Sequence, residues 1–389
     1  MYCIGVFLDL RKAFDVCSHE ILLKKLKKMG ILGTTHKWFT SYLEGRSQCV
    51  DIGGNLSSFI ELAISVIQGS TLGPLLFLCY INDLWSASTL FSVLFADDTA
   101  CLAKGHNLKE LSNYVNGELR KIANWFRANK MALNVSKTKF IIFRTVNKPV
   151  NPLDCVIIYN SNEIGAPDPD PALISPIERI HNEGRETSFK LLGVLLDEFL
   201  SFNDHITMLT CKISKSLYCI NRVKNFIDQR SLRTMYFAMI HSVMAYGIII
   251  YGCATKTNLE KLRIAQKKAV RTICNANYRA HTAPLFKELK ILPLDDLITY
   301  SRIKFMHSFY FNKLPMSFSE MWQTNFARNP ERALRNANDY YIPPHRVETV
   351  KRMPIVSLPS AWNSAPGDKL NPKQHLYLKK LKELLLSAI

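Results

Sequence analysis

Apolar residues recur along the first half of the chain at the spacings of short strands and amphipathic helices. Apolar runs over 4–10, 93–96 and 100–103 predict strands, and residues 139–144 predict another. Helical spacing predicts helices over 18–29, near 35–44 and from about 107 to 128. This mixture of strands and helices predicts an α+β fold for the first half.

The second half is dominated by helical periodicity, with apolar stripes over 206–220 and 262–273. Before it, residues 147–187 change character, because Ala-Pro-Asp-Pro-Asp-Pro at 166–171 excludes a helix or an inner strand. That segment is predicted to be a surface insertion. The uncharged stretch 234–255 is long enough to span a membrane, but its histidine, glycine and tyrosines favour a buried helix.

Asp97 and Asp98 lie side by side between two apolar runs, at the tip of a predicted hairpin. Adjacent carboxylates in apolar surroundings repel each other and lose hydration, so they need a cation or strong donors to stay ionised. The alternative is an ordinary turn, in which aspartate is a favourable residue. Asp9, near the end of the strand over 4–10, supplies a third acid and favours a site for hard divalent cations.

Between the two acid-bearing regions, residues 65–77 form a Gly-rich segment that contains Gln68 and Gly69. Glycines let a backbone approach a ligand closely, and the Gln68 amide can form hydrogen bonds with one.

Five motifs in this order resemble those of the reverse transcriptases of non-LTR retrotransposons, of the LINE or jockey-like kind. They are Phe-Leu-Asp-Leu-Arg-Lys-Ala-Phe-Asp (7–15), Gln-Gly-Ser-Thr-Leu-Gly-Pro (68–74), Phe-Ala-Asp-Asp-Thr (95–99), Leu-Asn-Val-Ser-Lys-Thr-Lys (133–139) and Phe-Lys-Leu-Leu-Gly-Val-Leu-Leu-Asp (189–197). The resemblance covers residues 1 to about 280. It implies an RNA-directed DNA polymerase with an antiparallel palm sheet and helices, followed by a helical thumb and a basic, mostly helical C-terminal region.

The resemblance also implies the catalytic residues. Asp9, Asp97 and Asp98 would bind two Mg²⁺ ions, with Mn²⁺ as an alternative, for attack of a primer 3′-hydroxyl on a nucleotide's α-phosphate. Lys137 would donate a proton to the departing pyrophosphate, unless it is an ordinary solvated loop lysine.

Other matching residues would bind the nucleotide and the primer. Phe14 would lie under the incoming sugar and exclude a ribose 2′-hydroxyl, with plain core packing as the alternative. Gln68 and Gly69 would contact the nucleotide or the template. Leu192 and Gly193 would belong to the strand pair that grips the primer end.

The net charge of +18 is concentrated in the second half. Residues 201–389 contain 29 Lys and Arg against 12 Asp and Glu, while residues 1–200 contain 21 against 20. This half is therefore expected to bind a polyanion. One face of the helix predicted over 258–274 is basic and is expected to meet no acid. This face is therefore expected to follow phosphates rather than serve only as a solvated surface. Its residues are Lys261, Arg263, Lys267, Lys268 and Arg271.

These patterns predict four regions. They are a palm in 1–145 without the family's fingers, a Pro-rich surface insertion in 146–187, primer-grip strands and a helical thumb in 188–280, and a basic region in 281–389. The expected partners are an RNA template, a DNA primer and deoxynucleoside triphosphates, with no membrane. Because the fingers would precede residue 1, a second interpretation stays open: a catalytically inactive nucleic-acid-binding remnant of such an element.

The ten cysteines show no Cys-x-x-Cys spacing, and several lie within apolar elements. They are expected to be reduced core residues without disulfide partners. The N-terminus shows no signal-peptide pattern. Together these features predict an intracellular protein of the cytoplasm or the nucleus that is not secreted.

Overall fold

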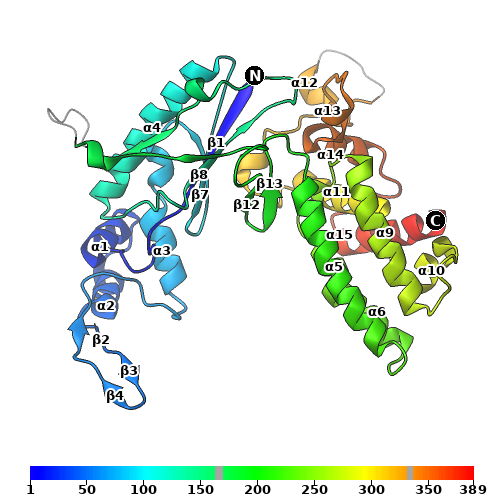
Figure 1. Ribbon diagram of the computed structural model, residues 1–389, viewed down its shortest axis with the longest axis horizontal. Helices are drawn as coiled ribbons and strands as arrows, with labels where there is room; N and C mark the ends of the chain where they lie inside the picture. Colours follow the sequence, from blue (N-terminus) through cyan, green and yellow to red (C-terminus); the bar gives the residue numbers. More distant parts are fainter. Residues whose placement is uncertain (163–169, 331–335) are drawn as a thin grey trace. The chain divides into compact units, whose positions relative to one another are not determined.

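The computed structural model describes residues 1–162, 170–330 and 336–389, and the chain divides into two compact units (Figure 1). Unit 1 contains Met1–Phe189 and Asp197–Phe199, and unit 2 contains Lys190–Leu196 and Leu200–Ile389. The chain therefore leaves unit 1, returns to it for three residues and leaves again. The first crossing lies next to the change predicted at residue 188, and the finer four-part division stays a prediction.

A five-stranded sheet of order β11-β8-β1-β7-β6 forms the centre of unit 1. β1 pairs antiparallel with both β7 and β8, β6 pairs antiparallel with β7, and β11 runs parallel to β8. The strands are β1 (Tyr2–Leu8), β6 (Phe91–Phe95), β7 (Asp98–Gly105), β8 (Lys139–Phe143) and β11 (Glu178–Ile180). The predicted α+β class and the predicted strands are confirmed.

Helices cover one face of this sheet (Figure 1). Residues of β1 alternate between the two faces, so Ile4, Val6 and Leu8 point into the core that the helices close. The helices are α1 (His19–Lys28), α2 (Gly33–Leu43), α3 (Gly73–Ile81) and α4 (Leu108–Ala128). The three predicted helices are confirmed to within about two residues at each end.

On the opposite face, the ring of Phe7 stacks on that of Phe189 with centroids 4.3 Å apart. Phe189 is the last residue of unit 1 before the chain first crosses to unit 2. Two small antiparallel ladders follow α2 in sequence. They join β2 (Ser47–Gln48) to β5 (Ile60–Glu61) and β3 (Asp51–Ile52) to β4 (Asn55–Leu56).

The segment 146–187 differs from the predicted surface insertion. Its strand β11 joins the central sheet, and Cys155, Ile157 and Ile177 are buried in the core of unit 1. The strands β9 (Ile158–Asn160) and β10 (Ile174–Pro176) form a separate ladder. Strands of three residues are too short to leave a periodic signal, which explains the error. Residues 166–169 of the proline stretch lie outside the described residues.

In the described part of unit 2, the named secondary structure is helical apart from the hairpin of β12 (Phe189–Leu191) and β13 (Val194–Leu196), whose first residue belongs to unit 1. The long helices α5 (Asn203–Val223) and α9 (Lys256–Ile273) lie side by side and run in the same direction (Figure 1). The other helices are α6 (Gln229–Tyr236), α7 (Ser242–Ala245), α8 (Ile248–Tyr251), α10 (Thr282–Leu289), α11 (Leu294–Tyr310), α12 (Asn325–Arg328), α13 (Glu348–Arg352), α14 (Pro354–Asn363) and α15 (Gln374–Ala388).

The uncharged stretch 234–255 is not the single buried helix that its composition predicts. A π-helical turn over Phe237–His241 follows α6, and α7 is separated from α8 by Tyr246 and Gly247. Gly247 has a φ of +67°, which ends the helical path there. Among the described residues, no helix combines the length and the apolar character needed to cross a membrane.

Candidate active site

The register of the central sheet brings the three predicted carboxylates to one end of it. β6 and β7 are joined by a two-residue turn of Ala96 and Asp97, and Asp98 is the first residue of β7. β1 ends at Leu8, which is paired with Thr99. Asp9 is the residue after Leu8, so it lies beside Asp98 on the neighbouring strand.

The three acids affect one another electrostatically. Burial raises the pKa of Asp98, and the negative charges of Asp97 and Asp9 raise that pKa further. A divalent cation would offset this repulsion, and carboxylate oxygens are the ligands that hard cations prefer.

The chemistry of these donors fits such an ion, and their role as metal ligands stays a prediction. In the described part of the chain, no three His, Cys, Asp or Glu side chains are grouped so that they could hold a metal ion.

Strand β6 is an exposed edge strand rather than the buried strand predicted from its apolar run. Phe91, Val93 and Phe95 are 62%, 47% and 63% exposed, whereas Leu94 packs against the core. Periodicity alone does not distinguish an apolar edge strand from an inner one. At the tip of the hairpin, Asp97 and Asp98 are exposed as well.

The motif over 133–139 forms a turn that holds the backbone of Asp9. The Asn134 amide donates a hydrogen bond to the Asp9 carbonyl at 2.8 Å, and the Asp9 amide donates to Oγ1 of the fully buried Thr138 at 3.2 Å. Lys137 is an exposed residue of the same turn. Sequence reasoning did not single out Asn134 or Thr138, although both belong to the quoted motif.

Phe14 and Gln68 each contact another residue of unit 1. The Phe14 ring is half-buried and stacks on Phe77 of α3, with centroids 4.5 Å apart. Core packing therefore accounts for part of its surface. Nε2 of Gln68 donates to Oδ1 of Asp15 at 2.5 Å, and both residues line a cavity of about 650 Å³ together with Arg46. Asp15 was not predicted as a site residue.

The Gly-rich segment needs glycine at two positions for reasons internal to the chain. Gly69 has a φ of +78°, a backbone angle that residues with a side chain rarely adopt. A Cβ on Gly73 would lie 2.5 Å from the Ile67 carbonyl oxygen. Oγ of Ser70 accepts from the Gly73 amide at 2.9 Å and donates to the Ile67 carbonyl at 2.7 Å. The atom that a side chain at Gly73 would meet, at the start of α3, is thus the backbone of Ile67 and not a ligand.

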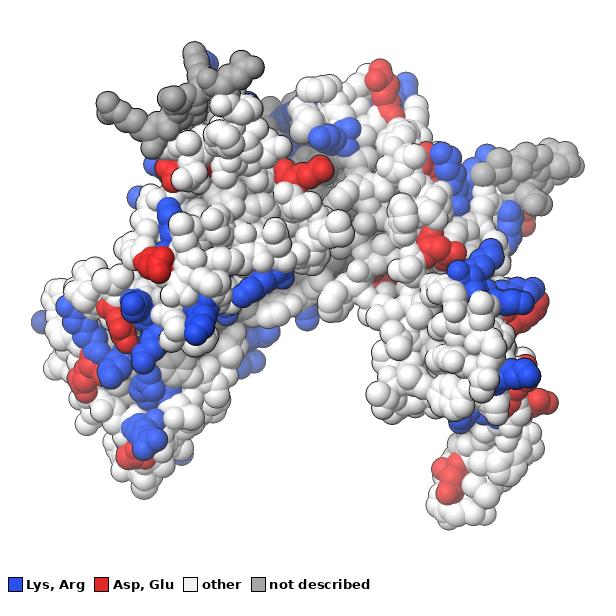
Figure 2. Space-filling view, turned by 180° about the vertical axis from the view of Figure 1, so that it is seen from behind, with Lys and Arg blue, Asp and Glu red and all other residues white. Residues whose placement is uncertain are grey.

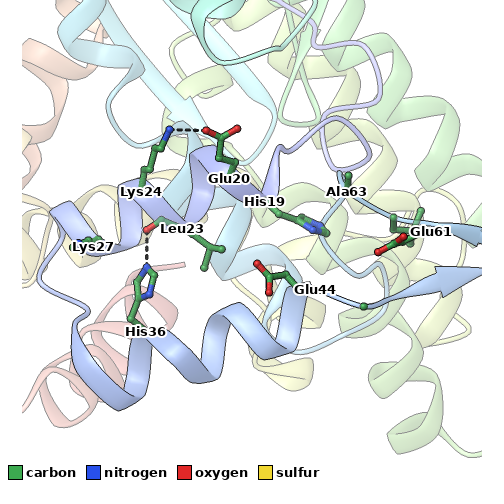
Figure 3. A pocket seen from close by; sticks show the side chains of 11 residues that line it. His19, Glu20, Leu23, Lys24, Lys27, His36, Glu44, Glu61 and Ala63 are labelled. Atoms are coloured by element: carbon green, nitrogen blue, oxygen red, sulfur yellow. Dashed lines mark hydrogen bonds and ion pairs between the residues drawn. The ribbon is translucent and has the colours of Figure 1, made fainter.

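A larger cavity of about 730 Å³ lies beside α1 and α2 (Figure 3). Nε2 of His19 is hydrogen-bonded to the Ser65 carbonyl at 2.7 Å, and Nε2 of His36 to the Leu23 carbonyl at 3.1 Å. These backbone partners give both imidazoles a structural role.

The predicted primer-grip residues form the turn of the β12–β13 hairpin. Leu192 and Gly193 have φ values of +45° and +87°, as expected for a tight hairpin turn. The Tyr246 hydroxyl donates to the Leu192 carbonyl, and a Cβ on Gly193 would lie 3.1 Å from the Tyr246 ring. Tyr246 fixes this turn, and no local pattern in the sequence connects it to residues more than 50 positions away.

The basic face of α9 contains one residue whose charge is already paired. Arg263 forms ion pairs with Glu260 at 2.8 Å and with Asp295 at 2.7 Å. The expectation that this face meets no acid is therefore wrong at Arg263. Asp295 belongs to α11, and helical periodicity within α9 gives no information about a neighbouring helix.

The other four basic residues of α9 have no ion pair recorded in the described structure. Lys261 donates to Oδ1 of Asn203 at 3.0 Å, and Nε of Arg271 donates to the Ala280 carbonyl at 3.0 Å. Lys267 and Lys268 are exposed.

Residues 1–196 match the family model described as reverse transcriptase (RNA-dependent DNA polymerase). The chain belongs to the reverse transcriptase family. The resemblance to the reverse transcriptases of non-LTR retrotransposons is confirmed. Enzymes of this family use divalent metal ions.

Curated relatives of this reverse transcriptase chain come from mobile elements of Drosophila melanogaster. It is 27% identical over 317 residues to the RNA-directed DNA polymerase from mobile element jockey, covering 78% of this chain and 32% of that protein. It is 26% identical over 314 residues to the probable RNA-directed DNA polymerase from transposon BS, covering 77% of this chain and 32% of that protein. The probable RNA-directed DNA polymerase from transposon X-element is 27% identical over 308 residues, covering 76% of this chain and 31% of that protein. The chain thus spans about a third of the length of these relatives.

Among solved structures, a telomerase from Candida albicans in complex with a fragment of telomeric RNA matches with a TM-score of 0.29. Its sequence is 14% identical, and the match covers 82% of this chain and 48% of that one. A similarity this low informs neither the fold nor the function.

Proposed function

We propose that this chain is the polymerase part of a non-LTR retrotransposon reverse transcriptase, which transfers deoxynucleotides onto a primer 3′-hydroxyl under the direction of an RNA template. The proposal rests mainly on the placement of Asp9 and Asp98 on adjacent strands, with Asp97 in the adjoining turn. Two Mg²⁺ ions, or Mn²⁺ in their place, would supply activation of the hydroxyl and stabilisation of the leaving oxygens. Asp9, Asp97 and Asp98 would hold them.

The chain's own residues then have separate tasks. The turn that contains Asn134 and Thr138 positions Asp9, and Lys137 in that turn is the candidate proton donor to pyrophosphate. Gln68 and Gly69 would contact the nucleotide or the template.

The primer would be held in unit 2 by the hairpin turn of Leu192 and Gly193, which Tyr246 fixes. The partners proposed for the chain are an RNA template, a DNA primer and deoxynucleoside triphosphates.

Primer extension by the 389-residue chain tests this function. The assay uses an RNA template, a labelled DNA primer, all four deoxynucleoside triphosphates and Mg²⁺ or Mn²⁺. Incorporation that requires both the template and the divalent ion, and stops with EDTA, is expected.

The alternative function is that of a catalytically inactive nucleic-acid-binding remnant of such an element. A chain that binds the template–primer but extends it with neither ion would be the inactive nucleic-acid-binding remnant.

Phe14→Val is expected to increase incorporation of ribonucleotides relative to deoxynucleotides by about 10- to 100-fold, the range set by small steric changes in a pocket. The smaller side chain leaves room for a 2′-hydroxyl. Single-nucleotide extension with matched ribo- and deoxynucleotides measures it. Phe77→Leu is the control, because it disturbs the same ring stack without altering the side chain at position 14. Discrimination unchanged by Phe14→Val would assign Phe14 to core packing alone.

The basic excess in residues 201–389 predicts salt-dependent binding of RNA or RNA–DNA hybrid with little preference for sequence. If about five phosphates are neutralised, log K should fall with log salt at a slope near −4. Replacing Lys267, Lys268 and Arg271 together with Glu should weaken binding and flatten that slope.

A salt titration of the full chain, followed by fluorescence anisotropy, measures the slope. Replacing three exposed lysines at α15 with Glu, namely Lys373, Lys379 and Lys380, is the control for net charge alone, because it changes the charge by the same amount. Equal flattening by both sets would show that the position of the charge on α9 does not matter. A slope near zero in the parent chain would remove the phosphate-binding assignment.

A further inference from the structure

We propose that the groove between the C-terminal halves of α5 and α9 binds one unpaired nucleotide of a single-stranded nucleic acid. Its base would stack on Tyr218 and Tyr278, and its phosphates would contact Lys224 and Lys268. The proposal rests on the proposed function only in taking nucleic acid as the partner of unit 2. It adds a pocket for a single unpaired nucleotide, separate from the polymerase carboxylates.

The groove is a concave site of about 450 Å³ within unit 2. Its volume lies within the range of roughly 300–1,000 Å³ typical of small-ligand sites. Ser214, Tyr218 and Asn221 line it from one face of α5, at the spacing of successive helical turns. Lys268 and Thr272 of α9 line the other side, and Tyr278 approaches from the loop that follows α9.

The charged residues that line the groove are all basic, namely Lys224, Lys268 and Arg271. Residues 205–227, which include most of α5, contain four Lys or Arg and no Asp or Glu. Residues 261–287, which include most of α9, contain seven Lys or Arg and no acid. In Figure 2, Lys and Arg side chains gather on the visible surface of unit 2. A groove between two such stretches attracts phosphates.

Basic residues near a helix C-terminus are common, because they complement the helix dipole, and this accounts for part of the charge. The dipole gives no reason for the two aromatic rings. Tyr218 is 66% exposed and Tyr278 is 76% exposed. Neither tyrosine takes part in a recorded ring contact, so both offer their faces to a ligand. Exposed aromatics in a basic groove are the usual means of binding single strands without sequence preference.

The loop that carries Tyr278 is held in place before any ligand binds. Nε of Arg271 donates to the Ala280 carbonyl at 3.0 Å, and the Ala276 amide donates to the Arg271 carbonyl at 2.9 Å. The Arg279 amide donates to Oδ1 of Asn277 at 3.0 Å. A preordered loop lowers the entropic cost of binding. Because the bases of a duplex are stacked inside it, only an unpaired base could enter between the rings.

The test compares single-stranded and duplex binding by the full chain. The probes are a 12-nucleotide RNA and its DNA counterpart, each carrying 2-aminopurine, and a blunt RNA–DNA hybrid of the same length. Replacing Tyr218 and Tyr278 together with Ala should weaken single-strand binding by about 30-fold, because the loss of one base–aromatic stack weakens binding by that order of magnitude. It should also remove the fluorescence quenching caused by stacking. Hybrid binding should change less than about threefold, because its contacts are to phosphates.

Replacing both tyrosines with Phe is the matched control, and it should keep the quenching and hold affinity within about twofold, because a phenyl ring also stacks. Three results would each overturn the pocket. They are an equal loss of affinity for the single strand and the hybrid, a single-strand affinity that the Ala changes leave unaltered, and a loss of affinity with Phe as large as that with Ala. Primer extension by the same variants separates this test from the polymerase assignment. If the Ala variant extends primers and binds single strands as the parent does, the pocket is refuted and the polymerase assignment is not.

Discussion

Replacing Asp97 with Asn is expected to abolish template-dependent primer extension while leaving the fold intact. A bound metal ion contributes several kcal/mol to transition-state stabilisation, so the loss should be about three orders of magnitude or more. Asp97 is an exposed residue of a two-residue turn, where asparagine is equally suitable. The thermal unfolding midpoint should therefore not fall, because the change also removes repulsion between Asp97 and Asp98.

Asp51→Asn supplies the control for this change, because Asp51 is another exposed aspartate of a hairpin in unit 1. It should leave the extension rate within about twofold, as surface changes remote from a site usually do. Binding of Mn²⁺, measured by calorimetry, should weaken with Asp97→Asn and not with Asp51→Asn. If Asp97→Asn retains the parent's extension rate, the metal assignment of the hairpin is wrong.

The parts of the site that follow from the sequence are those encoded within a few residues. Two apolar runs around Asp97 and Asp98 predict a hairpin with acids at its tip, and the paired strands β6 and β7 form it. The position of Asp9 beside Asp98 depends on β1 pairing with β7, which the local pattern does not encode. The resemblance to a family supplied that pairing.

The parts that could not be predicted depend on contacts between distant segments. Asp295 of α11 pairs with Arg263 of α9, and Tyr246 binds the turn at Leu192. Neither contact leaves a periodic signal in either partner. The exposure of β6 was missed for a related reason, because Phe91, Val93 and Phe95 would also suit an inner strand.

Glu198 is the second residue at which a single change should have a large effect, here on stability. Its carboxylate is 2% exposed and forms ion pairs with Arg144 at 3.1 Å and Arg179 at 3.2 Å. It also accepts a hydrogen bond from the Asn182 amide at 3.1 Å. These contacts attach the three residues that return to unit 1 to strand β11 and to the residue that follows β8. The partners are 54 and 19 residues away, so the cluster has no signature in the sequence.

Glu198→Gln is expected to destabilise unit 1 by about 3–5 kcal/mol, because it leaves two largely buried guanidinium groups without their counter-charge. That is a large part of the roughly 5–15 kcal/mol by which a domain is usually stable. Since the chain has two units, amide hydrogen exchange of β1 and β8 measures unit 1 separately from unit 2. Glu186→Gln, at an exposed position elsewhere in unit 1, should change the free energy of exchange by less than about 0.5 kcal/mol. Equal exchange rates in the two variants would mean that water or neighbouring carbonyls satisfy Arg144 and Arg179, and that the return of the chain to unit 1 depends on packing instead.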